Sequence, residues 1–519
     1  MTSSPLSAAT PAAPTERPPR SGTALLLGTG LAAGGVALSI AWSALDLVPH
    51  VTDSVAYLFQ GRIFAAGALY LPPPPFPFLF GHENVLLTAT RWCSTYPPGW
   101  PLLLALGWWI HAPWLLSPLL LTLAVVGVGV AGRRLYDRTT GVLAALALAA
   151  SPFALLMAAD AMAHVPALCA TVWCVAELSG AVRGAGGPTT RRHLLAAGGC
   201  GGFAFLIRPF TAVALLAPWA LWGAWALLRR RRPKDLLWIA AGALPCFAAL
   251  AVYNQRVFGG PLTSGYVLAQ LQRFGPLSGM AEPLRIALLR NLPWYLRHLN
   301  GCLWGFPWGD LVLLLLVLLA RPWRLADAVL ALSAASLVVA HSFFPYGDII
   351  YSGPRYAFES LGPLSLLAAR ALTAAAARLQ NVLQRWPRSA RLAAAGVAVA
   401  ALLYFPLGRR LPAQVLEHAQ WYLAQSGAPL RAGRRAGLGS EPLVFVAGSP
   451  WCYSSFLLAN SLYPARGGPV YVRDVPPLRA AVMKVFRRPE TWIVRVVVTI
   501  DPRHPDQATP REISWQRLH

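Results

Sequence analysis

The feature that most constrains this chain is a series of apolar runs, many of them long enough to cross a lipid bilayer. A membrane-spanning helix needs about 20 mostly apolar residues. These runs predict an all-α polytopic membrane protein with about eleven transmembrane helices. They lie at residues 23–45, 113–132, 140–158, 164–180, 193–207, 211–228, 236–253, 302–320, 325–343, 357–377 and 392–408.

The low charge content supports the same conclusion. Only 12% of the 519 residues are charged, whereas an ordinary globular protein has about 25%. So few charges cannot cover a soluble particle of this size. A surface that faces lipid needs no charges, so a membrane location explains the low charge content.

The net charge of +24 comes from 44 basic and 20 acidic residues. In a soluble protein it would suggest nucleic-acid binding. Here the basic residues follow alternate predicted helices, which is the pattern of cytoplasmic loops. We therefore expect no nucleic-acid partner, a cytoplasmic N-terminus and, with an odd number of helices, an external C-terminal region. The basic clusters lie at 133–138, 183–192, 229–234, 321–324 and 378–391.

Composition divides the chain into three parts. Residues 1–20 are rich in Ser, Pro, Ala and Thr, which predicts a disordered cytoplasmic tail. Residues 21–408 form the predicted transmembrane domain, with long outer loops at 46–112 and 254–301. Residues 409–519 predict a small extracytoplasmic α/β domain, with strands at 442–447, 469–473 and 491–499 and a helix near 477–486.

Two local patterns add detail. Gly30 and Gly34 form a GxxxG pair, which indicates close packing of the first helix. Residues 53–67 have helical spacing of apolar side chains, so we expect a helix lying on the membrane surface.

Several acidic residues lie near predicted helix ends. Asp53 follows the first helix and is either a helix-start acid that favours the positive end of the dipole or a general base whose pKa burial raises. Asp160 and His164 are four residues apart, which places them on one helical face. They are either a helix cap and a packing residue or functional groups at the membrane boundary. Two ligands make weak evidence for a metal site, so a divalent metal stays an open possibility.

Two arginines lie at predicted outer helix ends. Arg208 opens one apolar run, and Arg355 follows a Gly-Pro pair one turn before Glu359. Each is either a phosphate clamp, because the guanidinium fork matches phosphate oxygens, or a side chain that reaches the interface by snorkelling. The middles of the helices carry almost no charge, whereas a transporter places polar sites near the bilayer midplane. The pattern therefore favours a reaction at the outer interface.

Short motifs resemble the GT-C glycosyltransferases, specifically the bacterial group similar to lipid A aminoarabinose transferase and to protein O-mannosyltransferases of family 39. The first is Asp53 in Thr-Asp-Ser-Val-Ala-Tyr57, followed by Gln60 and Ala65-Ala-Gly67. The second is Tyr96-Pro-Pro-Gly-Trp-Pro101. The third is Gly353-Pro-Arg-Tyr356, followed by Phe358-Glu359 and Leu361-Gly-Pro363, and segment 253–266 adds to it.

The resemblance implies an inverting transfer of a sugar from a polyprenyl-phosphate donor to an unidentified extracytoplasmic acceptor, in the bacterial inner membrane. The implied partners are membrane lipids, the lipid-linked sugar and the acceptor. The expected site has catalytic Asp53 and Asp160, phosphate-binding Arg355 and Arg208, no assigned metal ligand, and substrate-binding Tyr57, His164, Tyr96, Tyr356 and Glu359.

The residues fit this chemistry independently of the resemblance. Asp53 can accept a proton from the acceptor, Arg355 and Arg208 can stabilise the departing phosphate, and the apolar helices can hold a polyprenyl tail. The sequence has no Gly-rich phosphate loop, which favours a lipid donor over a nucleotide donor. Two other functions stay open: a transporter or flippase of lipid-linked sugars, and a non-catalytic membrane scaffold.

Overall fold

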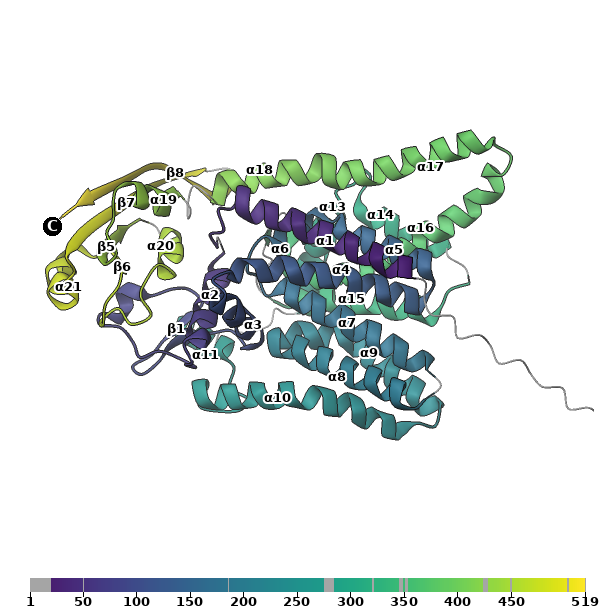
Figure 1. The fold of residues 1–519 in the computed structure, drawn as a ribbon, viewed down its shortest axis with the longest axis horizontal. Helices are drawn as coiled ribbons and strands as arrows, with labels where there is room; N and C mark the ends of the chain where they lie inside the picture. The colour runs from purple at the N-terminus through teal and green to yellow at the C-terminus, as the bar shows by residue number, and fades with distance from the viewer. Residues whose placement is uncertain are drawn as a thin grey trace, which may run out of the picture.

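The computed structural model describes residues 20–49, 51–184, 186–274, 284–319, 322–344, 349–350, 353–422, 428–448, 450–501 and 504–518. Long helices run side by side along the longest dimension of the molecule, and a small β-sheet lies at one end of them (Figure 1). The predicted disordered tail lies outside the described residues, except for Arg20, which begins the first helix.

The helices follow one another in the order that the apolar runs predict. In chain order they are α1 (Arg20–Ser43), α2 (Thr52–Ala65), α3 (Gly99–Trp109), α4 (Leu116–Leu135), α5 (Arg138–Ala149), α6 (Pro152–Ala158), α7 (His164–Arg183), α8 (Pro188–Ile207), α9 (Pro209–Arg229), α10 (Leu236–Phe258), α11 (Gly265–Phe274), α12 (Leu284–Ile286), α13 (Leu292–Cys302), α14 (Asp310–Leu315), α15 (Leu325–Ser342), α16 (Leu361–Leu383), α17 (Arg388–Leu403) and α18 (Leu411–Tyr422). Short 3-10 or π turns join them at η1 (Pro77–Phe80), η2 (Pro113–Leu115), η3 (Pro233–Asp235), η4 (Ala287–Asn291), η5 (Leu316–Leu319), η6 (Arg355–Ser360) and η7 (Tyr404–Arg410).

The helical membrane part is confirmed, but the predicted number of eleven spans is not. Among the described residues, 8 helices are long and apolar enough to cross a membrane, or up to 9 if α5 and α6, bent by 61°, form one span. The helix α8 is long enough but falls outside this set. Its first turns carry Arg191, Arg192 and His193, which lower its mean hydropathy.

The predicted span at 302–320 is wrong, because this segment is not one helix. The helix α13 ends at Cys302 and α14 begins at Asp310. Between them Gly305 and Gly309 have φ values of 71° and 89°, which side chains rarely adopt. The Asp310 carboxylate accepts hydrogen bonds from the backbone N–H groups of Trp304, Gly305 and Phe306, and so stabilises the turn.

The first helix packs closely on α4, as the GxxxG pair indicates. A Cβ atom at Gly34 would lie 2.3 Å from Thr122 Oγ1. That hydroxyl donates a hydrogen bond to the Gly30 carbonyl oxygen over 3.0 Å. Small residues therefore let the two backbones approach, as they do in membrane helix pairs.

The outer surface of the helices is apolar where it faces away from the core. Large side chains of α10 and α17 are more than half exposed, among them Leu237, Leu244, Val252, Leu392 and Val397. Apolar surface of this extent is stable only when lipid or another apolar partner covers it. The chain is accordingly an integral membrane protein.

The C-terminal part contains a four-stranded sheet with the order β6-β5-β7-β8. Its strands are β5 (Pro442–Ala447), β6 (Val470–Arg473), β7 (Glu490–Asp501) and β8 (His504–Arg517), with α19 (Ala428–Arg435), α20 (Pro450–Leu457) and α21 (Arg479–Phe486) beside them. The strand β5 runs parallel to β6 and β7, and β7 pairs antiparallel with β8. The first three strands lie where the sequence predicts them. The fourth was missed because its segment is polar and contains Pro505 and Pro510, which an edge strand tolerates.

The long loop 46–112 folds between the helices and the sheet (Figure 1). It contains α2, α3 and a hairpin of β1 (Val85–Leu87) and β2 (Trp92–Ser94). The prediction that α2 lies on the membrane surface is wrong, because Val55 and Ile63 are fully buried in a core that also contains Phe445. Arg62 Nη1 donates hydrogen bonds to the carbonyl oxygens of Leu458 (3.1 Å) and Asn460 (2.7 Å), which tie α2 to the sheet region.

Candidate active site

Asp53 lies in the first turn of α2 and contacts side chains from two other segments. Its Oδ2 lies 2.9 Å from Nη1 of Arg355, and its Oδ1 accepts a hydrogen bond from the Tyr96 hydroxyl over 2.5 Å. Asn84 Nδ2 lies 3.5 Å from Oδ2. The side chains of Asp53 and Arg355 are 13% and 11% exposed, so this ion pair is largely buried.

The pKa of Asp53 is lowered, whereas the interpretation of this residue as a general base assumed a pKa that burial raises. Burial raises the pKa of this carboxyl, but the Arg355 guanidinium and the hydrogen bond from Tyr96 outweigh burial and lower it below its ordinary value of 3.8. The carboxyl is therefore ionised at neutral pH. The expectation failed because the sequence did not reveal that a cation and a hydroxyl reach the same carboxylate.

A short antiparallel strand pair directly precedes Arg355. The short strand β3 (Ile349–Ile350) pairs with β4 (Gly353–Pro354), and η6 begins at Arg355 directly after this pair. A Cβ atom at Gly353 would lie 2.7 Å from the Phe153 ring, so only glycine lets the turn approach α6 this closely. The Gly-Pro turn therefore holds the guanidinium beside Asp53.

A second polar group lies around Glu359, which is fully buried. Its Oε1 lies 3.1 Å from Nδ1 of His164 and 3.4 Å from Nε of Arg208. His164 begins α7, and Arg208 lies in the break between α8 and α9, where its Nε also donates to Thr211 Oγ1 over 3.2 Å. Glu359 thus joins two helix starts to η6.

Tyr356 connects the two groups. The Cζ atom of Arg355 lies 4.8 Å from the centre of the Tyr356 ring, and Cζ of Arg208 lies 5.9 Å from it. Arg355 Nη2 also donates to the Tyr356 hydroxyl over 3.0 Å. Two guanidinium groups therefore pack against one aromatic ring, with the Asp53 carboxylate beside one of them and Glu359 beside the other. We call Asp53, Arg208, Arg355, Tyr356 and Glu359 the arginine–carboxylate cluster.

Three tyrosines lie next to Asp53. The rings of Tyr57 and Tyr96 stack at 4.2 Å, and Tyr266 meets Tyr96 edge-on at 5.2 Å. Burial raises the pKa of Tyr266 to about 12 and raises the pKa values of Tyr57 and Tyr96 well above their ordinary range. All three phenols are therefore neutral at physiological pH and can donate hydrogen bonds.

Asp160 does not share a helical face with His164. The helix α6 ends at Ala158 and α7 begins at His164, so a turn separates the two residues. Asp160 Oδ2 accepts a hydrogen bond from Ser54 over 2.8 Å, and its Oδ1 accepts one from the backbone N–H of Ala161 over 2.6 Å. The spacing argument failed because a four-residue separation places side chains together only within one continuous helix.

Some residues of the site were not singled out from the sequence. The ring of His341 stacks on Tyr356 at 5.5 Å, and Asn84 and Tyr266 lie beside Asp53 and Tyr96. His341 had a usable signal, because a histidine inside an apolar helix is a functional candidate. Asn84 had none, because its contact depends on how the long loop folds.

No metal centre emerges from the described part of the chain. Within it, no group of three or more His, Cys, Asp or Glu side chains is placed to hold a metal ion. Asp160 and His164, the pair that suggested a metal, contact Ser54 and Glu359 instead.

Comparison with known proteins identifies the fold. No family model matches the sequence, and no curated protein matches it. Solved structures do match and show the fold: the chain has the fold of ArnT, in agreement with the resemblance of the short motifs to the GT-C group.

Among these structures is ArnT from Cupriavidus metallidurans bound to undecaprenyl phosphate, at a TM-score of 0.58 and 16% identity, covering 95% of this chain and 98% of that one. The same protein in the apo state matches at a TM-score of 0.56 and 16% identity, covering 95% and 97%. An oligosaccharyltransferase from Archaeoglobus fulgidus, tethered to an acceptor peptide, matches more weakly, at a TM-score of 0.49 and 12% identity, covering 92% of this chain and 69% of that one.

Proposed function

We propose that this protein is a membrane glycosyltransferase that moves a sugar from a polyprenyl-phosphate donor to an extracytoplasmic acceptor, with inversion at the anomeric carbon. The observation that carries the proposal is the arginine–carboxylate cluster, in which two arginines and an ionised carboxylate meet at the starts of membrane helices. The fold supports it, because ArnT, which shares this fold, was solved with undecaprenyl phosphate.

The two arginines bind the donor phosphate. Within the described part of the chain, the Arg208 guanidinium forms hydrogen bonds and ion pairs only through its Nε atom. Its two Nη groups can therefore bind phosphate oxygens. Glu359 and His164 hold Arg208 in place. When the sugar–phosphate bond breaks, the leaving polyprenyl phosphate gains a negative charge, and Arg355 and Arg208 stabilise that charge as it develops.

Asp53 acts on the acceptor. The acceptor oxygen attacks the anomeric carbon, the bond from this carbon to the phosphate oxygen breaks, and the acceptor proton passes to the Asp53 carboxylate. Its lowered pKa makes Asp53 a weak base in the ground state. The attacking hydroxyl becomes strongly acidic as the new bond forms, so an ionised, well-oriented carboxylate suffices late in the reaction. A single displacement of this kind inverts the anomeric centre.

The remaining predicted residues support this arrangement. Tyr57 and Tyr96 form an aromatic wall for the sugar, and Tyr356 packs against both guanidinium groups. Asp160 acts through Ser54, which precedes Tyr57 in α2, so it is a positioning residue rather than a catalytic one.

We further propose that the site lies on the extracytoplasmic side of a bacterial inner membrane. The Arg62 contacts with Leu458 and Asn460 support a location of α2 and the sheet region on the same side of the membrane. The transferred unit is a hexosyl or pentosyl group, and the acceptor is a lipid, a glycan or a protein.

Incubation of the purified protein with radiolabelled polyprenyl-phospho-sugars tests the proposal. We expect an acceptor-dependent release of polyprenyl phosphate that Asp53→Asn lowers by about 10²- to 10⁴-fold. Asp474→Asn is the matched control, because Asp474 is an ion-paired carboxylate of the sheet region that contacts Arg479. Movement of intact donor across vesicles without release of polyprenyl phosphate would contradict the proposal and indicate a flippase.

A further inference from the structure

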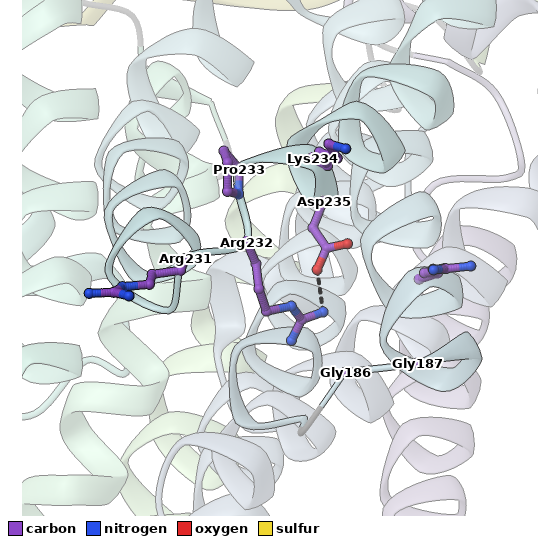
Figure 2. A pocket seen from close by; sticks show the side chains of 8 residues that line it. Gly186, Gly187, Arg231, Arg232, Pro233, Lys234 and Asp235 are labelled. Atoms are coloured by element: carbon purple, nitrogen blue, oxygen red, sulfur yellow. Dashed lines mark ion pairs between the residues drawn. The ribbon is translucent and has the colours of Figure 1, made fainter.

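A second polar site lies where α9 ends and α10 begins. A pocket of about 370 Å³ opens there, lined by the Gly186–Gly187 turn, Arg191, Arg231, Arg232, Lys234 and Asp235 (Figure 2). Four of these side chains are basic and one is acidic. The pocket has no part in the proposed transfer.

The pocket lies at the opposite face of the membrane from the arginine–carboxylate cluster. The helix α9 begins directly after Arg208, a member of the cluster, and ends at Arg229, beside the pocket. Its 21 residues span about 30 Å, which is the thickness of the hydrocarbon core. The helices α9 and α10 are both candidate membrane spans, so the turn that joins them lies at a membrane boundary.

The pocket has an excess of positive charge. Arg232 forms an ion pair with Asp235, and the dashed line in Figure 2 marks it. Among the described residues no carboxylate pairs with Arg191, Arg231 or Lys234, all of which are exposed. A ligand entering the pocket therefore meets three cations that no internal acid neutralises.

The backbone at Arg231 is in the left-handed region. Arg231 has a φ of 56°, its N–H donates to the Leu228 carbonyl, and the N–H of Arg232 donates to the Leu227 carbonyl. This is the helix ending at which glycine usually occupies the left-handed position.

Tryptophans place the pocket at the level of lipid headgroups. Cζ of Arg191 lies 5.7 Å from the Trp238 ring, and Cζ of Arg229 lies 5.2 Å from the Trp225 ring. Tryptophan and basic side chains gather at the membrane–water interface, and α10 is almost unburied, so its surface beside the pocket faces lipid.

We propose that this pocket binds the phosphate headgroup of an anionic phospholipid in the leaflet opposite the arginine–carboxylate cluster. The recognised chemistry is a phosphate anion, and basic pockets between membrane helices bind such headgroups. The lipid-facing position of α10 favours a lipid over free phosphate, because acyl chains can lie along Leu237 and Leu244.

Native mass spectrometry of the detergent-solubilised protein tests the proposal, with phosphatidylglycerol, phosphatidylcholine and inorganic phosphate as separate probes. The test variant is Arg191→Gln/Arg231→Gln/Lys234→Gln, which leaves the Arg232–Asp235 pair intact. The matched control is Arg378→Gln/Arg385→Gln/Arg388→Gln, which removes the same charge from exposed positions around the α16–α17 turn. We expect the wild type to retain phosphatidylglycerol over phosphatidylcholine. The test variant should bind phosphatidylglycerol more weakly by on the order of 100-fold, at about fivefold for each charge.

Arg231→Gly separates binding from folding. It removes the strain and the charge together, so it should raise the unfolding temperature while weakening phosphatidylglycerol binding by about fivefold. Equal retention of phosphatidylglycerol by wild type and the triple test variant would overturn the proposal, as would an equal loss in the control triple variant. Saturation by inorganic phosphate without preference for phosphatidylglycerol would overturn the lipid as the ligand.

Discussion

Replacing Arg355 with alanine should move the acidic limb of the pH–rate profile to higher pH. Two opposing effects act on the pKa of Asp53: burial raises it, while Arg355 and Tyr96 lower it. Without Arg355 the pKa of Asp53 rises, because only Tyr96 and Arg208 then oppose the effect of burial. The proposed reaction needs the ionised form, so activity is lost as the pH falls through the pKa of Asp53 in the folded protein. In the wild type this loss lies below the ordinary value of 3.8, and in Arg355→Ala it lies at higher pH than in the wild type.

The same substitution should also lower the rate at neutral pH. Arg355 makes one charge-assisted contact with Asp53 at 2.9 Å and, in our proposal, another with the donor phosphate. A hydrogen bond to a charged group contributes about 1.5–3 kcal/mol. The loss of both lowers kcat/KM by about 100-fold or more. Arg355→Lys retains the charge but not the bidentate contact of the guanidinium. We therefore expect kcat/KM to fall roughly tenfold and the acidic limb to stay close to that of the wild type.

Single-turnover release of polyprenyl phosphate, measured between about pH 3 and pH 8, gives the rate at neutral pH and the position of the acidic limb. Arg378→Ala, an exposed arginine far along α16, is the control. If Arg355 only reached the membrane interface by snorkelling, lysine would replace it fully. An unchanged rate and an unchanged acidic limb in Arg355→Ala would refute the assignment of Arg355 and the account of the Asp53 pKa.

Three further predictions follow from single contacts. Tyr96→Phe removes the hydroxyl that donates to Asp53, so the free energy of the transition state should rise by about 1.5–3 kcal/mol and kcat/KM should fall accordingly. The unfolding temperature should stay unchanged; steady-state kinetics and a thermal melt check the two expectations. Gly34→Ala should destabilise the protein by about 1–3 kcal/mol because its Cβ would meet Thr122, whereas Gly35→Ala, with open space around it, should not; thermal unfolding in micelles compares them. Reporter fusions after residues 138, 188, 232 and 385 should lie in the cytoplasm and those after 90, 275 and 450 outside, and an external reporter at 232 would reverse the proposed orientation.

The sequence was a good guide to what depends on local composition. Apolar runs predicted most of the membrane helices, because each run must bury its own backbone hydrogen bonds in lipid. Strand-like runs separated by polar, Pro- and Gly-rich turns predicted the strands β5, β6 and β7. The prediction of a membrane span at 302–320 failed because the segment is apolar in composition, while Gly305, Gly309 and the Asp310 carboxylate impose a turn within it.

What only the tertiary structure decided is which polar groups meet. The sequence identified Asp53, Arg208, Arg355 and Glu359 as candidates, but the pairing of Asp53 with Arg355 and of Glu359 with Arg208 joins segments from opposite halves of the chain. The sign of the Asp53 pKa shift depends on these contacts, because burial alone would raise the pKa, while the Arg355 guanidinium and the Tyr96 hydroxyl lower it. Composition and spacing thus determine where helices cross the membrane, while the electrostatics of the site depend on distances that no local pattern encodes.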